Sequence, residues 1–201
     1  MEQNEFQNQG HAQPPQDLLR RYHIYNPNLL VAPMYPGTDQ LVPIDPENPY
    51  RRAREWQADQ WPSDANVAIS TGSRNHLVVL SVKSEQARER LFAAATDESG
   101  DLTPYMVRIP NAIHCYYRTR YDRTSVPVAP ASMEMRGIEV ITDGGYVPGA
   151  GSVIDEWQCK TLLDATLDIP SIPELPRQMA DLLGLVAISD HPAYKPRMRM
   201  L

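Results

Sequence analysis

Side chains that could bind phosphates or metal ions stand in three separate apolar stretches of this sequence. Ser81 and Lys83 end the first stretch. His114 lies within the second, and Glu139 lies within the third. A lysine ammonium can hold a phosphate directly, whereas a carboxylate can ligate a hard divalent cation. If the stretches are β-strands, Ser81 and Lys83 share one face, because side chains two residues apart point the same way.

Several neighbouring residues have plainer interpretations. Arg118, Arg120 and Arg123 form a basic cluster after His114 that could line a path for phosphates, but charge clusters are usually solvated faces. His114 lies in an apolar stretch and also fits a buried histidine satisfied within the core. Cys115 is expected to be a small buried hydrophobe, because the sequence shows no base beside it.

Composition favours one globular domain. The chain has 201 residues, of which 42% are hydrophobic and 22% are charged. The net charge of −6 argues against strong sequence-independent binding of nucleic acid, although a protein with a negative net charge can still carry a local basic patch. There is no apolar run of about 20 residues for a membrane span. We expect a cytoplasmic protein, since the first residues lack a secretory pattern and the two cysteines form no disulfide framework.

The pattern along the chain predicts an α+β domain with a tail at each end. We expect a disordered tail at 1–16, a domain at 17–185 and a second tail at 186–201. Strands are predicted at 29–34, 66–70, 76–82, 105–109, 113–118, 133–141 and 146–147. Helices are predicted at 17–25, 51–61, 84–95 and 172–185. Turns at 71–73, 110–111 and 143–145 predict hairpins between consecutive strands.

Four motif-bearing segments occur in a fixed order. They are a strand ending in Pro-Gly (31–37), a Trp-Pro, Asn-Val-Ala and Thr-Gly block (61–84), a strand pair with a His before aromatic residues (107–118), and a Gly-Gly-Tyr-Val block (137–152). In this order they resemble the N-terminal domain of bifunctional DNA primase/polymerases, in the archaeo-eukaryotic primase superfamily. The resemblance implies paired antiparallel strands that form a central cleft, with helices on its flanks.

The sequence departs from that family where the catalytic metal should bind. The family's first block ends with two carboxylates, but this chain has Ser81, a poor ligand, and Lys83, which repels Mg²⁺. The family's third acid is kept as Glu139, whereas Ile141 replaces a basic residue two positions later. One carboxylate is too few to hold two divalent ions. We therefore expect no catalytic metal, no cofactor and no catalysis.

The resemblance also implies a nucleotide site. It gives His114 the role of contacting a nucleotide's phosphates, and Arg118 and Arg120 are candidate phosphate ligands beside it. The turn before His114 is one residue shorter than usual and has Asn111 where a glycine is common. Two interpretations of Lys83 stay open: an ordinary surface residue at a strand end, or an ammonium that holds a phosphate where a cation once sat.

These observations predict a primase–polymerase-like domain that has lost its metal-binding acids. We expect it to bind nucleotide, single-stranded nucleic acid or a replication partner such as a separate helicase, in a phage or mobile-element setting. One alternative is an active nucleotidyltransferase whose Mg²⁺ or Mn²⁺ site is rebuilt from Glu85, Glu139, Asp143 or Asp155. Another is a protein-interaction scaffold, which the acidic balance favours over tight DNA binding.

Overall fold

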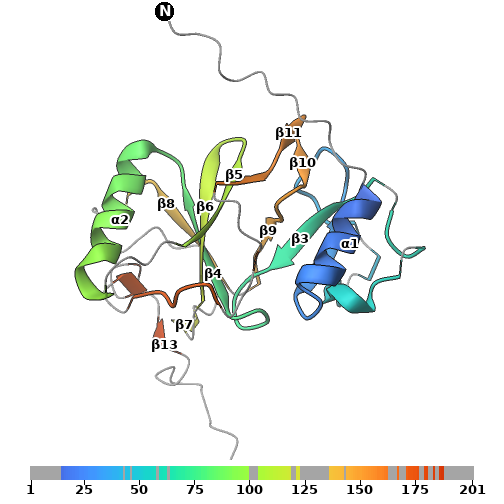
Figure 1. Cartoon of the computed structure of the whole chain (residues 1–201), viewed down its shortest axis with the longest axis horizontal. Helices are drawn as coiled ribbons and strands as arrows, with labels where there is room; N and C mark the ends of the chain where they lie inside the picture. The colour runs from blue at the N-terminus through green and yellow to red at the C-terminus, as the bar shows by residue number, and fades with distance from the viewer. Residues whose placement is uncertain are drawn as a thin grey trace, which may run out of the picture.

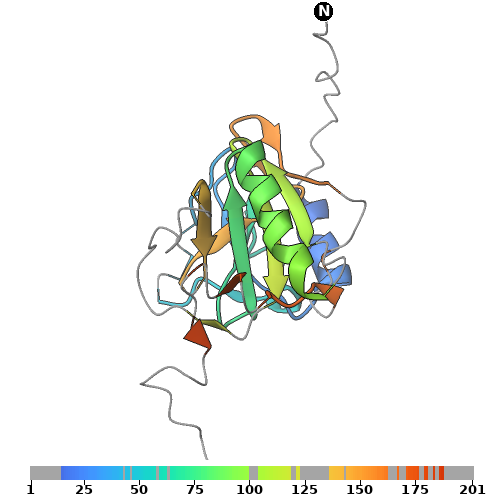
Figure 2. The same cartoon turned by 90° about the vertical axis from the view of Figure 1, so that its left-hand side faces the viewer.

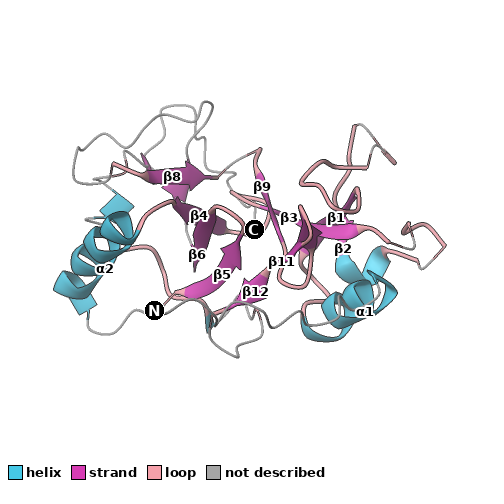
Figure 3. Ribbon diagram, turned by 90° about the horizontal axis from the view of Figure 1, so that it is seen from above, coloured by secondary structure: helices cyan, strands magenta, loops and turns pink. Residues whose placement is uncertain are grey.

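Two antiparallel sheets lie between two helices (Figure 1). The computed structural model of the chain describes residues 15–42, 44–45, 47–57, 59–62, 64–99, 104–118, 121–122, 136–142, 144–162, 167, 171–176, 179–180, 183 and 186–187. Figure 3 shows α1 (Pro15–Tyr25) and α2 (Glu85–Ser99) at opposite ends of the molecule, with the sheets between them. This arrangement confirms the predicted α+β class.

The strands follow a different order in space than along the chain. Within the described part of the chain, the smaller sheet has the order β2 (Arg51–Arg52), β1 (Leu30–Met34), β3 (Asn66–Ser70) and β9 (Tyr146–Pro148). The larger sheet has the order β12 (Lys160–Thr161), β5 (Tyr105–Ile109), β6 (Ala112–Arg118), β4 (Leu77–Val82) and β8 (Ile138–Ile141). Two short pairs join β10 (Val153–Ile154) to β11 (Trp157–Gln158) and β7 (Tyr121–Asp122) to β13 (Val186–Ala187).

Each face of the larger sheet packs against a separate apolar cluster. Every residue of β4 is buried, which fits a central strand covered on both sides. On the outer face, Val78 and Leu80 cluster with Ala87 and Leu91 of α2. Figure 2 shows α2 lying across the strands of this sheet. The outer face is therefore covered by α2 together with Leu175, Met179, Ala180 and Leu183 from the segment near the C-terminus.

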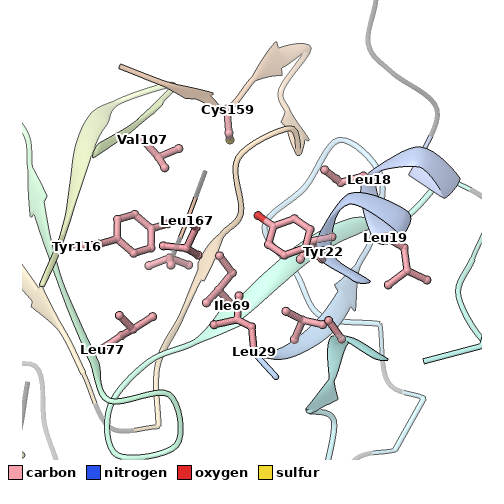
Figure 4. Close-up of a cluster of buried hydrophobic side chains, with 14 of the residues drawn as sticks. Leu18, Leu19, Tyr22, Leu29, Ile69, Leu77, Val107, Tyr116, Cys159 and Leu167 are labelled. Atoms are coloured by element: carbon pink, nitrogen blue, oxygen red, sulfur yellow. The ribbon is translucent and has the colours of Figure 1, made fainter. Parts of the chain in front are cut away.

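The inner face of the larger sheet joins it to the smaller sheet. Figure 4 shows Tyr116 of β6 pointing toward Ile69 of β3 and Tyr22 of α1. The Tyr116 hydroxyl donates to the Pro148 carbonyl of β9 at 3.4 Å, and its ring meets that of Tyr105 edge to face at 5.2 Å. Large buried aromatic side chains dominate core energetics, so Tyr116 is a principal link between the sheets.

Most predicted elements are present. The strands β1, β3, β4, β5 and β6 form where the apolar stretches predict them, and β5 and β6 pair across the turn at 110–111. The helix expected at 84–95 is α2. Ser84 caps this helix, because the Ala87 N–H donates to Ser84 Oγ at 3.2 Å.

The helix predicted at 51–61 is wrong. Arg51–Arg52 form β2, which pairs with β1, and a short 3₁₀ helix, η1 (Ala53–Glu55), follows. The buried Trp56 donates its indole N–H to the Val31 carbonyl at 2.9 Å, and its ring meets that of Trp61 edge to face. Pairing with β1 and burial of these two indoles outweigh helix propensity over this segment.

Two of the three predicted hairpins are also wrong, because their turns carry the chain from one sheet to the other. β3 pairs with β1 and β9, whereas β4 pairs with β6 and β8. The Asn75 side chain holds the crossing after β3 by bonding the main chain of Leu30 and the Ser70 carbonyl. The turn after β8 likewise crosses from the larger sheet to β9 of the smaller sheet. Gly144 there has the expected positive φ of 77°, and Asp143 lies outside the described residues.

The closing helix begins later than predicted. The Arg118 N–H donates to Pro173 and the Leu175 N–H donates to Arg118, so this segment runs extended beside β6. Among the described residues, helical bonds run from the Ala180 N–H to the Pro176 carbonyl and from the Leu183 N–H to the Met179 carbonyl. Pro173 and Pro176 have no N–H to give to a preceding turn, which explains the late start.

The expected tails lie largely outside the described residues, at 1–14 and 188–201. α1 begins at Pro15, two residues before the predicted domain start. Val186–Ala187, placed in the second tail, form β13. No helix in the described ranges combines the length and apolar character needed to cross a membrane.

Candidate functional site

Strand register brings the polar residues of three apolar stretches into one row. Ser81 of β4 pairs directly with His114 of β6 on one side and with Glu139 of β8 on the other. Directly paired side chains share a face of the sheet, so all three point to the inner face. Lys83 follows two residues after Ser81, and its N–H still pairs with the Gly137 carbonyl of the β8 segment at 3.1 Å.

This row lines a cleft of about 560 Å³ between the two sheets. The larger sheet contributes Ser81, Lys83, His114, Glu139, Ile141 and the turn at 109–112. The smaller sheet and its loops contribute Thr38, Asp39, Gln40, Tyr146, Pro148, Ile154 and Asp155. Ser81, Lys83, His114 and Glu139 therefore all line one cleft, as the order of the motifs led us to expect. His114 was expected across the cleft from the other three, and this is wrong, because it pairs directly with Ser81 on the same wall.

Lys83 and Glu139 form an ion pair within the cleft. The Lys83 Nζ lies 2.8 Å from Glu139 Oε2, and the two side chains are 58% and 47% exposed. An ion pair this exposed contributes only about 0–1 kcal/mol to stability. The ammonium is thus held beside the one retained acid position, yet it can exchange that partner for another anion at small cost.

His114 supplies a neutral ring to the cleft wall. The residue is 3% exposed, and its Nδ1 is buried with no hydrogen-bond partner among the described residues. Burial lowers the pKa of His114 to about 4, although the nearby Glu139 carboxylate acts in the opposite direction. At neutral pH the ring can therefore donate or accept a hydrogen bond but adds no positive charge.

Arg118 is not brought to the cleft. It pairs with Leu77, two pairing steps along the sheet from His114, which is about 13 Å along a strand. Its Nε is buried without a hydrogen-bond partner in the described part of the chain. The structure thus places this candidate phosphate ligand beside the core. Arg120 and Arg123 lie outside the described residues. Cys115 is fully buried on the opposite face, and burial raises the pKa of its thiol to about 12.

The residues that the resemblance places at the metal site do not fit two divalent ions. Ser81 offers only a hydroxyl, Lys83 offers a cation, and Glu139 is engaged by Lys83. The described residues contain no group of three or more His, Cys, Asp or Glu side chains arranged to hold a metal ion. Of the acids considered for a rebuilt site, Asp155 lines the cleft, whereas Glu85 pairs with Arg88 at the start of α2.

Sequence reasoning missed most of the second wall. The Tyr146 hydroxyl donates to the Asp39 carbonyl at 3.0 Å, which ties β9 to the 38–40 loop. Asp155 and Glu156 both have positive φ, of 47° and 66°, as a two-residue hairpin turn requires. The Asp155 N–H donates to the Gly37 carbonyl at 3.0 Å and sets that turn over the cleft. The Pro-Gly and Gly-Gly-Tyr-Val motifs mark these segments but not which side chains face the cleft.

Comparison with known proteins agrees with the geometry. The family model for the bifunctional DNA primase/polymerase N-terminal domain matches residues 28–178, which include both sheets and the whole described cleft. A comparison with curated proteins finds no match. Because the family model covers well over half of the chain, the motifs, the two-sheet cleft and this match lead to one conclusion: the chain belongs to the bifunctional DNA primase/polymerase N-terminal family.

Proposed function

We propose that this domain binds a nucleotide or single-stranded nucleic acid in its cleft without a divalent metal ion, and does not catalyse nucleotidyl transfer. The observation that carries the proposal is the ion pair between Lys83 and Glu139, 2.8 Å long. This ammonium stands beside the only acid kept from the family's metal-binding set. It neutralises the carboxylate that a divalent cation would need.

Charge at the site supports the loss of catalysis. Two-metal transfer needs several anionic oxygens that converge on both ions. Here Ser81 is uncharged and Lys83 has the sign of the ion it would have to bind. Restoring ligation at these positions requires at least the removal of Lys83, because an ammonium within reach of Glu139 competes with Mg²⁺ for the same oxygens.

The same residues support phosphate binding. The half-exposed ion pair with Glu139 contributes only about 0–1 kcal/mol, so Lys83 can exchange Glu139 for a phosphate oxygen at small cost. His114 lies on the neighbouring strand, directly opposite Ser81, where its neutral ring N–H can donate to the same phosphate.

Membership of this family indicates a role in DNA replication. We therefore propose a cytoplasmic replication partner, such as a separate helicase, as the protein class that works beside it. The alternative, a scaffold that binds only protein, predicts that the cleft residues bind neither nucleotide nor nucleic acid.

Binding and extension assays test the proposal. We expect binding of nucleotide or single-stranded DNA in EDTA, weakened by salt and unchanged by Mg²⁺. We expect no primer synthesis or extension with Mg²⁺ or Mn²⁺. Lys83→Ala should abolish binding with the fold intact, while Lys160→Ala, an exposed lysine outside the cleft, serves as its matched control.

Two outcomes contradict the proposal in different ways. Robust extension that Glu139→Ala abolishes would establish an active enzyme with a rebuilt metal site. Absence of binding to both ligands at millimolar concentration would leave the scaffold as the remaining function.

A further inference from the structure

The charges of the cleft are unevenly distributed between its walls. Among the described residues that line it, Asp39, Glu139 and Asp155 are acidic and Lys83 is the only lysine or arginine. His114 adds no charge at neutral pH, because burial lowers its pKa to about 4. The single ammonium and the imidazole belong to the larger sheet. Asp39 and Asp155 belong to the opposite wall, where Tyr146 and Ile154 supply apolar surface beside them.

This distribution discriminates between ligands by their number of phosphates. Carboxylates only accept hydrogen bonds, so Asp39 and Asp155 repel a nearby phosphate and cannot donate to it. A sugar hydroxyl, in contrast, can donate to these carboxylates. In a metal-dependent site, divalent ions offset the charge of a triphosphate. One ammonium, shared with Glu139, cannot do so.

We infer that the cleft takes a ligand with a single phosphate, held between Lys83 and His114, whose sugar hydroxyls face Asp39 and Asp155. The inference rests on the proposed function and narrows it to a nucleoside monophosphate or one phosphodiester of an RNA strand, which keeps a free 2′-hydroxyl, in preference to a nucleoside triphosphate. A cleft of about 560 Å³ lies within the size range of small-molecule sites, so one nucleotide unit fits it.

Isothermal titration of the full-length protein in EDTA tests the ligand class. The probes are the four ribonucleoside 5′-monophosphates, the matching triphosphates and the matching dinucleoside monophosphates, each titrated separately. We expect the best single-phosphate probe to bind about tenfold or more tightly than its triphosphate. Tighter binding of the monophosphate than of the dinucleoside monophosphate identifies a terminal phosphate as the ligand, and the reverse identifies a phosphodiester within a strand.

The failures are distinguishable. A triphosphate that binds as tightly as the monophosphate, or more tightly, overturns this inference and leaves metal-free nucleotide binding intact. Absence of heat with every probe at millimolar concentration overturns the inference, and absence of binding to single-stranded DNA as well overturns the proposed function.

A matched pair of variants tests the cause. Asp155→Asn removes one carboxylate and keeps a side chain that tolerates positive φ, whereas Glu156→Gln removes its neighbour's charge outside the cleft lining. We expect Asp155→Asn to reduce the preference for monophosphate over triphosphate by about threefold, and Glu156→Gln to leave it within error. Equal effects of the two variants, with circular dichroism unchanged, would show that the Asp155 carboxylate does not set the preference.

Discussion

Two rows of side chains on the inner face of the larger sheet are two residues apart along β4, one buried in the core and the other polar and facing the cleft. Val79 pairs with Tyr116, and both are fully buried against the smaller sheet; we call this pair the core row. Two residues further along β4, Ser81 lies between His114 and Glu139 and faces the cleft; we call these three the cleft row. The same backbone pairing supports both rows. A substitution in the cleft row therefore leaves the strands paired, so the fold does not depend on which polar side chains line the cleft.

The largest expected effect is on the core row. Tyr116→Ala removes the ring that joins the sheets and leaves a cavity, so we expect the free energy of unfolding to fall by about 3–5 kcal/mol. Tyr25→Ala, at a tyrosine that is 57% exposed, is the control and should change it by less than about 0.5 kcal/mol. Urea denaturation measures both. Comparable losses for the two variants would show that the core row does not hold the sheets together.

The contrast between the rows also explains what sequence reasoning could reach. The spacing of Ser81 and Lys83 was enough to predict that they share one face, and the resemblance was enough to predict a cleft between paired strands. The opposite wall depends on which sheet β3 and β9 join. Thr71 and Gly72 look the same in sequence whether the next strand folds back or crosses to another sheet, so two crossings were interpreted as hairpins. Trp56 was likewise assigned to a helix, because its bond to the Val31 carbonyl is a tertiary contact.

The second prediction concerns pH and the neutral His114 of the cleft row. Its pKa is lowered to about 4 in the folded state from 6.5, so the unfolded chain binds more protons between these values. Stability from this residue is therefore complete above about pH 6.5 and is lost as pH falls toward 4, by up to about 3 kcal/mol. His114→Gln should flatten this part of the profile, whereas His76→Asn, at an exposed histidine, should not. Thermal unfolding from pH 4 to 7 measures the slopes, and parallel profiles for wild type and His114→Gln would contradict the assignment.

The third prediction converts the cleft row toward a metal site. Ser81→Asp with Lys83→Asp places three carboxylates where register brings positions 81 and 139 together. Their mutual repulsion should lower stability in EDTA. Mg²⁺ should then raise it by about 1.4–2.7 kcal/mol at 10–100 times its dissociation constant. The melting temperature of the wild type should not respond to Mg²⁺. A double variant that is also insensitive to Mg²⁺ would show that the cleft row has lost more of the metal site than its charges.

The smallest expected effect on stability separates the two interpretations of Lys83. Its ion pair with Glu139 is half exposed, so Lys83→Ala should change the free energy of unfolding by less than about 0.5 kcal/mol, as should the control Lys160→Ala. Binding distinguishes the two interpretations. If Lys83 is an ordinary surface residue, Lys83→Ala leaves nucleotide affinity unchanged, whereas if Lys83 binds the phosphate, the substitution removes that affinity. We expect Lys83→Ala alone to abolish binding in EDTA, measured by titration on the samples used for denaturation. If Lys83→Ala lowers the free energy of unfolding as well as the affinity, Lys83 has a structural role. Loss of binding alone places its contribution entirely in the cleft, because nothing in the strand pairing of β4 depends on its ammonium.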